Sequence, residues 1–267
     1  MPPPNVKPVD TIEDYIREIR SLQAGTPDPL WFRGIGSATY RLTPTLFRHS
    51  SITDPAALAD LEKKLLTRFK HRSIPFQTRQ SRDDWELFFL MQHFGVPTRL
   101  LDWSENPFVA LYFAITSAET RMSGAAFSGP AAVWVLNTKL WNQSVLSPFY
   151  GGRILTLPDA FLDGYAPGHE RMPLHAKPVA MAGIYNSERI VAQRGAFTIF
   201  GHINEPMESI FDTQSFPVDS LLKIELPTAH LADLRQALFS LGYADSMMYP
   251  DLGGLAKEMK REFGFGV

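Results

Sequence analysis

The chain has 267 residues, of which 26 are Lys or Arg and 28 are Asp or Glu, so the formal net charge is −2. A hydrophobic content of 45% excludes wholesale disorder, and the absence of cysteine from the sequence excludes disulfides, thiolate nucleophiles and Cys-ligated metal sites. The near-neutral charge gives no overall attraction to nucleic acid, although a local basic patch is compatible with it. No apolar run approaches the ~20 residues of a membrane helix, and the N-terminus does not resemble a signal peptide. We therefore expect a cytoplasmic protein that does not associate with a membrane.

Hydrophobic periodicity predicts mainly helices in the first half of the chain. Residues 10–22 are predicted to form a helix with one apolar face, and residues 30–34 are predicted to form a short buried strand that ends in a glycine. Three more helices are expected at residues 56–69, 84–94 and 105–118. The last of these is apolar on nearly every side, which is typical of a central, buried helix.

Strand signals gather in the second half. Residues 131–136, 197–200 and 221–226 are predicted strands, and residues 231–241 and 255–263 are predicted closing helices. This order favours an α+β fold in a single domain over a repeated βαβ pattern.

The densest group of polar and aromatic side chains lies in residues 92–107, which we interpret as a turn-rich join between two apolar helices. The polar and aromatic side chains that meet here are those of Gln92, His93, Arg99, Asp102 and Trp103, as a ligand pocket at helix ends would require. A structural interpretation competes with this one. Asp102 or Ser104 could cap the following helix, and Arg99 could form an ion pair with Asp102.

Two further side chains are candidates for ligand contacts. Arg33 follows two aromatic residues at the end of an apolar strand, so it needs an anionic partner, either a ligand phosphate or carboxylate or an acidic side chain of the protein. Gln193 precedes a predicted tight turn at Arg194 and Gly195 between two strands. Its amide could orient a ligand or merely satisfy backbone groups.

Common catalytic and nucleotide motifs are missing from the sequence. It contains no Walker phosphate loop, no Gly-rich dinucleotide fingerprint, no His-Glu-x-x-His and no nucleophile elbow. The seven histidines are scattered without paired metal spacing, so no metal site is expected.

The chain resembles the FRG-domain family, which takes its name from a Phe/Tyr-Arg-Gly motif. The resembling segments are Phe32-Arg33-Gly34, residues 42–44, 92–104, 110–114 and 189–198, and the closing stretch at residues 250–257. The resemblance implies one FRG domain over residues 25–267, preceded by an N-terminal helical extension at residues 1–24.

A more distant resemblance is to ADP-ribosyltransferases. It implies a split, mostly antiparallel sheet flanked by helices, with NAD as substrate. The residues that it assigns to NAD binding are Arg33, Arg99, Ser104, Trp103 and Tyr112, with Arg33 on the pyrophosphate and Trp103 or Tyr112 stacked on nicotinamide. The residues that it assigns to catalysis are Glu188 or Asp102, one of which would be the acid, and Gln193, which could orient the ribose. The ADP-ribosyltransferase pattern has a catalytic Glu on a later strand, which corresponds to residues 190–200 here. The sequence departs from the pattern there, because the expected Glu position is not clearly occupied and Gln193 is the polar residue typical of the FRG family.

Three functions follow as hypotheses. The first is an NAD-dependent ADP-ribosyltransferase or NAD glycohydrolase that acts as a toxin or defence effector. The second is another nucleotide- or nucleic-acid-processing enzyme, and the third is a non-enzymatic recognition module. A nucleotide is the expected ligand, and convergence of Arg33, Arg99, Asp102 and Gln193 on one cleft would favour a site.

Overall fold

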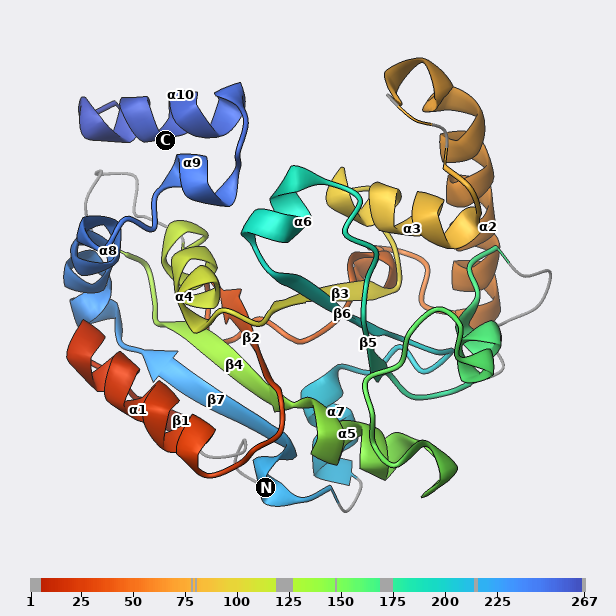
Figure 1. Ribbon diagram of the computed structural model, residues 1–267, viewed down its shortest axis with the longest axis horizontal. Coiled ribbons are helices and arrows are strands. Elements are labelled where there is room, and N and C mark those ends of the chain that lie inside the picture. Colours follow the sequence, from red (N-terminus) through yellow and green to blue (C-terminus); the bar gives the residue numbers. More distant parts are fainter. Residues whose placement is uncertain are drawn as a thin grey trace.

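A seven-stranded sheet lies at the centre of the computed structural model (Figure 1), which describes residues 6–77, 79, 81–118, 127–146, 148–168, 175–213 and 216–265. The strands are β1 (Val6–Pro8), β2 (Leu30–Ile35), β3 (Leu100–Ser104), β4 (Ala131–Asn137), β5 (Val179–Met181), β6 (Gly195–Ile199) and β7 (Leu221–Leu226). Their order is β1-β7-β4-β2-β3-β6-β5. β1 pairs with β7 in parallel, and all the other neighbours are antiparallel. The expected α+β fold around one mostly antiparallel sheet is confirmed.

Helices cover both faces of this sheet. They are α1 (Ile12–Ala24), α2 (Pro55–Arg72), α3 (Asp84–His93), α4 (Pro107–Thr116), α5 (Thr138–Val145), α6 (Glu188–Ala192), α7 (Met207–Thr213), α8 (Leu231–Ser240), α9 (Asp245–Met248) and α10 (Leu252–Glu262). On one face, α1, α4 and α8 share a core with β2, β4 and β7, while α2 and α3 share another with β3, β5 and β6. A third core lies on the opposite face, against α5 and α7. None of the described helices has the length and hydropathy needed to cross a bilayer.

The sheet is nearly divided between β2 and β3. These two strands pair only at Phe32 and Ser104, whereas β2 pairs with β4 along its whole length from Leu30 to Ile35. The sheet therefore consists of a half formed by β1, β7, β4 and β2 and a half formed by β3, β6 and β5, joined at one residue pair. The gap beside that pair positions the site described below.

Helix α4 packs directly against β2 at Gly34. A Cβ atom on Gly34 would lie 1.8 Å from the carbonyl oxygen of Ala110 and 2.5 Å from the amide nitrogen of Ala114. Only glycine allows two backbones to approach this closely. Asn106 caps the helix by accepting a hydrogen bond from the amide of Phe108, which fixes where the helix begins beside the strand.

Two sequence expectations for local structure are wrong. Residues 92–107 are not only a turn-rich join, because they contain the central strand β3. The segment before Gly195 is not a strand of a hairpin but the short helix α6, which is capped by the Ser187 hydroxyl accepting from the amide of Ile190. Arg194, with φ of 45°, then reverses the chain into β6.

The N-terminal segment is integrated with the rest of the chain. β1 forms an edge of the common sheet, and Tyr15 and Ile19 of α1 lie in the same core as α4. The Tyr15 hydroxyl also donates to the carbonyl oxygen of Pro107 over 2.7 Å. Residues 1–5 of the proposed extension lie outside the described residues.

Candidate functional site

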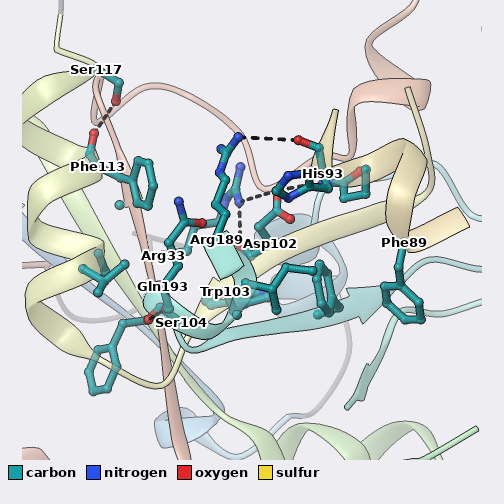
Figure 2. Close-up of a pocket in the computed structure, with 18 residues that line it drawn as sticks. Arg33, Phe89, His93, Asp102, Trp103, Ser104, Phe113, Ser117, Arg189 and Gln193 are labelled. Carbon is teal, nitrogen blue, oxygen red and sulfur yellow. Dashed lines mark hydrogen bonds and ion pairs between the residues drawn. The ribbon is translucent and has the colours of Figure 1, made fainter. Parts of the chain in front are cut away.

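A pocket of about 230 Å³ lies over the gap between β2 and β3, enclosed by α3, α4 and α6 (Figure 2). Its apolar lining includes Phe32, Phe89, Val109, Phe113, Ile190 and Phe197. Its polar lining consists of Arg33, Gln92, His93, Asp102, Ser104, Ser117, Arg189 and Gln193. An aromatic pocket with a few convergent polar groups is the usual form of a small-molecule site.

Arg33 reaches the pocket through the gap in the sheet. Its neighbours Phe32 and Gly34 face α4, so alternation along the strand starts Arg33 on the opposite face. The guanidinium nevertheless donates from Nη1 to the carbonyl oxygen of Asp102 over 2.5 Å, and lies 3.9 Å from the Asp102 carboxylate. Burial lowers the pKa of Arg33, the Asp102 carboxylate counteracts this, and Arg48 lowers that pKa further. Arg33 remains a cation, because arginine stays protonated in proteins.

Asp102 supplies the carboxylate of the described pocket lining. Gln92 donates from Nε2 to its Oδ2 over 2.7 Å, and the other end of the Gln92 amide, its oxygen, accepts from the Thr98 hydroxyl. The Thr98 bond therefore fixes which end of the amide faces Asp102. The Asp102 side chain is 56% exposed, so it is accessible to a ligand even though it has partners within the protein.

His93 and Arg189 form the other side of the pocket mouth. Arg189 lies over the ring of Tyr249, 4.6 Å from its centroid, and donates to the carbonyl oxygen of His93 over 3.5 Å. Burial lowers the pKa of His93 and Arg189 lowers it further, while Asp102 and Asp251 oppose this shift. The imidazole is therefore neutral at neutral pH. Arg189 is thus a second cation beside Asp102, as the labelled side chains in Figure 2 show.

Ser104 and Gln193 line the pocket but make their hydrogen bonds within the protein. The Ser104 hydroxyl donates to the carbonyl oxygen of Gln193 over 2.6 Å and accepts from the amide of Asn106. Gln193 donates from Nε2 to the carbonyl oxygen of Met248 over 2.9 Å. These bonds attach the end of α6 to β3 and to α9, which holds Arg189 in place over the pocket.

Arg99 does not share the cleft, contrary to the expectation that it converges with Arg33, Asp102 and Gln193. It is 2% exposed and forms a buried ion pair with Glu62 of α2, with a separation of 2.5 Å. It also donates to the backbone carbonyl oxygens of Phe200 and Tyr165. The alternative pairing with Asp102 is also wrong, because Glu62 takes that role.

Three other candidate residues are not placed for the roles expected of them. Trp103 contacts the pocket, but its indole belongs to the core on the opposite face and donates to the Thr198 hydroxyl over 3.1 Å. Tyr112 is fully buried, its hydroxyl bonds to Asp245, and burial raises its pKa far above the usual value. Glu188 is exposed in the first turn of α6 and does not line the pocket.

A second cavity of about 440 Å³ adjoins the pocket on its outer side. The two share the lining residues Gln92, His93, Asp102 and Arg189. The site thus has an aromatic inner part and a more polar outer part that meet at Asp102. Across the part of the chain that the structure describes, no group of three or more His, Asp or Glu side chains is arranged to hold a metal ion.

Residue chemistry placed Gln92 and His93 in the segment expected to form a pocket without giving either a role, and it missed Arg189 as a lining residue. All three lie within segments that carry the family resemblance, at residues 92–104 and 189–198. That position was the available signal. Nothing in their spacing along the chain indicates that α3 and α6 meet over one strand.

Comparison with known proteins gives one match. The family model of the FRG domain matches residues 28–122. No curated protein and no solved structure matches the chain. The matched segment contains Arg33, Gln92, His93 and Asp102, whereas Arg189 and Gln193 lie beyond it. Extension of the domain over residues 25–267 therefore stays a prediction. Residues 28–122 are therefore similar to the FRG domain, and this segment contributes the Arg33 and Asp102 side of the pocket.

Proposed function

We propose that the pocket binds NAD and that the protein is an NAD-dependent ADP-ribosyltransferase or NAD glycohydrolase. The observation that carries this proposal is the placement of two guanidinium groups, Arg33 and Arg189, around the Asp102 carboxylate at the mouth of an aromatic pocket. A guanidinium fork suits a pyrophosphate. An aromatic inner wall, with Phe113 and Phe89, suits a planar leaving ring.

The size of the site supports a ligand with two ends. The inner pocket of about 230 Å³ would take the nicotinamide, and the outer cavity of about 440 Å³ would take part of the adenosine half. The pyrophosphate would then lie where the two cavities meet, beside Arg189. Arg33 would reach the same region from beneath, through the gap in the sheet.

Asp102 is the proposed catalytic carboxylate. Breaking the bond between nicotinamide and ribose passes through an oxocarbenium-like state, which a nearby carboxylate stabilises. The bonding electrons move to the nicotinamide ring and neutralise its positive charge, so neutral nicotinamide leaves. An oxygen of water or of an acceptor forms the new bond to the ribose C1′. The proton of that nucleophile passes to the neutral imidazole of His93.

The Asp102→Asn variant tests this assignment. We expect nicotinamide release to fall by about 100-fold or more, with NAD affinity retained, because the carboxylate acts mainly when the cation forms. Calorimetry measures NAD binding, and chromatography measures nicotinamide in the same preparations. Glu188→Gln is the matched control, since Glu188 is an exposed acid of α6 outside the pocket. A wild-type protein that neither binds NAD nor releases nicotinamide, with or without cell extract as acceptor, would contradict the proposal.

One observation favours a recognition module as the second candidate. Ser104 and Gln193 both use their hydrogen-bonding groups within the protein. Binding of NAD or ADP-ribose without any turnover in cell extract would identify this module.

For an NAD-consuming enzyme we propose a role as toxin or defence effector. Expression of the wild type, but not of the Asp102→Asn variant, should then lower the cellular NAD concentration.

A further inference from the structure

Basic side chains are concentrated in one part of the chain. Residues 60–82 contain seven Lys or Arg and two acidic residues, whereas the remainder contains 19 basic and 26 acidic residues. A chain with a net charge of −2 therefore has a strongly positive segment, which includes most of α2 and the residues that lead towards α3.

Part of this positive charge is free for a partner. Lys63, Arg68 and Arg72 are exposed on α2, and none of them forms an ion pair with another described residue. Arg79 and Arg82 both pair with the buried Glu86, so one acid serves two guanidiniums. Their side chains remain 60% and 73% exposed.

Exposed aromatic rings lie among these cations. Phe76 is 86% exposed and Phe94 is 68% exposed. Both rings line a groove of about 710 Å³ that Arg72 and Arg79 also line. Exposed rings beside cations form a surface on which planar groups can stack.

The grooves form a continuous path to the candidate active site. Arg72 is common to a surface depression along α2 and to the aromatic groove. His93 and Phe94 are in turn common to the aromatic groove and the outer cavity beside Asp102. In Figure 1, α3 extends from α2 towards α6, along the same direction. We call this surface the basic track, defined by Lys63, Arg68, Arg72, Phe76, Arg79 and Phe94.

We propose that the basic track binds a single-stranded nucleic acid. Unpaired guanidiniums match the phosphates of such a strand, and the Phe76 and Phe94 rings match unstacked bases. A duplex hides the faces of its bases, and an acidic peptide offers no regular series of planar rings. This binding stands independently of NAD chemistry. The idea that a bound strand reaches Asp102 as the acceptor rests on the proposed function.

Fluorescence anisotropy with a labelled single-stranded oligonucleotide tests the proposal. We expect Phe76→Ala to weaken binding about ten-fold, because a base can no longer stack on the ring. In the double variant Arg68→Ala/Arg72→Ala, we expect the slope of log K against log salt to become shallower by about 0.7 for each phosphate that the protein no longer neutralises. The double variant Arg17→Ala/Arg20→Ala is the matched control, because it removes two exposed arginines of α1, on the side of the molecule away from α2 (Figure 1).

The remaining outcomes each overturn the proposal. Absence of binding at low salt does so, as does equal or tighter binding of a duplex of the same sequence. Complete displacement of the oligonucleotide by polyglutamate at matched charge would assign the surface to an acidic protein instead. NAD hydrolysis by the Arg68→Ala/Arg72→Ala variant is measured in parallel and should be unchanged, so failure of the basic track and failure of the proposed function give different results.

Discussion

Arg33 and Arg99 are two guanidiniums with opposite uses. Arg99 directs its donors to Glu62 and to two backbone carbonyl oxygens, with almost no contact with solvent. Arg33 donates to the carbonyl oxygen of Asp102, and its side chain is 22% exposed at the pocket. Arg99 therefore holds α2 against β3, and Arg33 is available to an anionic ligand.

Substitution of these two arginines should affect different properties. We expect Arg99→Met to lower the free energy of unfolding by ~3–5 kcal/mol, because it leaves the buried Glu62 carboxylate without its cation. Arg33→Met should change stability much less and abolish NAD binding. Urea unfolding measures the first effect, and calorimetry the second. The double variant Glu62→Leu/Arg99→Met should recover part of the missing stability, and equal stability of the Arg99→Met protein and the wild type would contradict the structural role.

Two histidines should make stability depend on pH. Burial lowers the pKa of His93 and of His175 below 6.5, the ordinary value, although a hydrogen bond with the Phe161 carbonyl opposes this shift in the pKa of His175. As the pH falls below 6.5, these imidazoles bind protons in the unfolded chain but stay neutral in the folded chain. The stabilisation from the neutral imidazoles is therefore complete above pH 6.5 and is lost as the pH falls towards the folded pKa values.

The variant His175→Gln isolates one of these contributions. We expect the free energy of unfolding of this variant to change less steeply between pH 7 and pH 5.5 than that of the wild type, whatever its absolute stability. Chemical denaturation at a series of pH values measures both slopes. Parallel curves for the two proteins would show that His175 does not titrate differently on folding.

At the scale of elements, contact between α4 and β2 determines the shape of the pocket. The helix lies on the strand because Gly34 has no side chain, and the same contact brings Phe113 to the pocket wall. The Phe-Arg-Gly motif can thus be understood physically. Its arginine lines the pocket, and its glycine allows the close approach of the helix that forms the pocket wall.

Gly34→Ala tests this explanation. A methyl group would lie 1.8 Å from the carbonyl oxygen of Ala110, so either α4 must move or the protein will not fold. We expect a loss of several kcal/mol of stability or a failure to accumulate as folded protein. Gly129→Ala is the control, because nothing lies within 4 Å of its added methyl group. Wild-type thermal stability of Gly34→Ala would contradict the close contact.

Sequence patterns predicted most of the long helices and the strands β2, β4, β6 and β7, and they missed the shortest strands. α1, α2, α3, α4 and α8 have apolar periodicity or caps of their own, and the structure confirms them. β1 and β5 have three residues each and are defined by pairing with distant strands. The partner of Arg99 was missed for the same reason, since Glu62 is 37 residues away in the chain.

For the whole molecule, the sequence predicted the fold class and one mostly antiparallel sheet, but only part of the site. Arg33, Asp102, Ser104 and Gln193 do line one pocket, because the segments that contain them meet on neighbouring strands or at their ends. The direction in which a side chain leaves its strand depends on register. Register follows from cross-strand pairing, which a single sequence does not contain.

The single residue pair between β2 and β3 would couple the proposed reaction to release of its products. Arg33 belongs to one half of the sheet and Asp102 to the other, so intact NAD in contact with both residues would link the two halves across the β2–β3 boundary. Cleavage divides NAD into nicotinamide and ADP-ribose, and neither product needs to contact both halves of the sheet. Amide hydrogen exchange at Phe32 and Ser104 should then be slower with NAD in the Asp102→Asn protein than with ADP-ribose at equal occupancy. Equal protection of these amides by the two ligands would mean that pairing between β2 and β3 does not depend on whether NAD is intact.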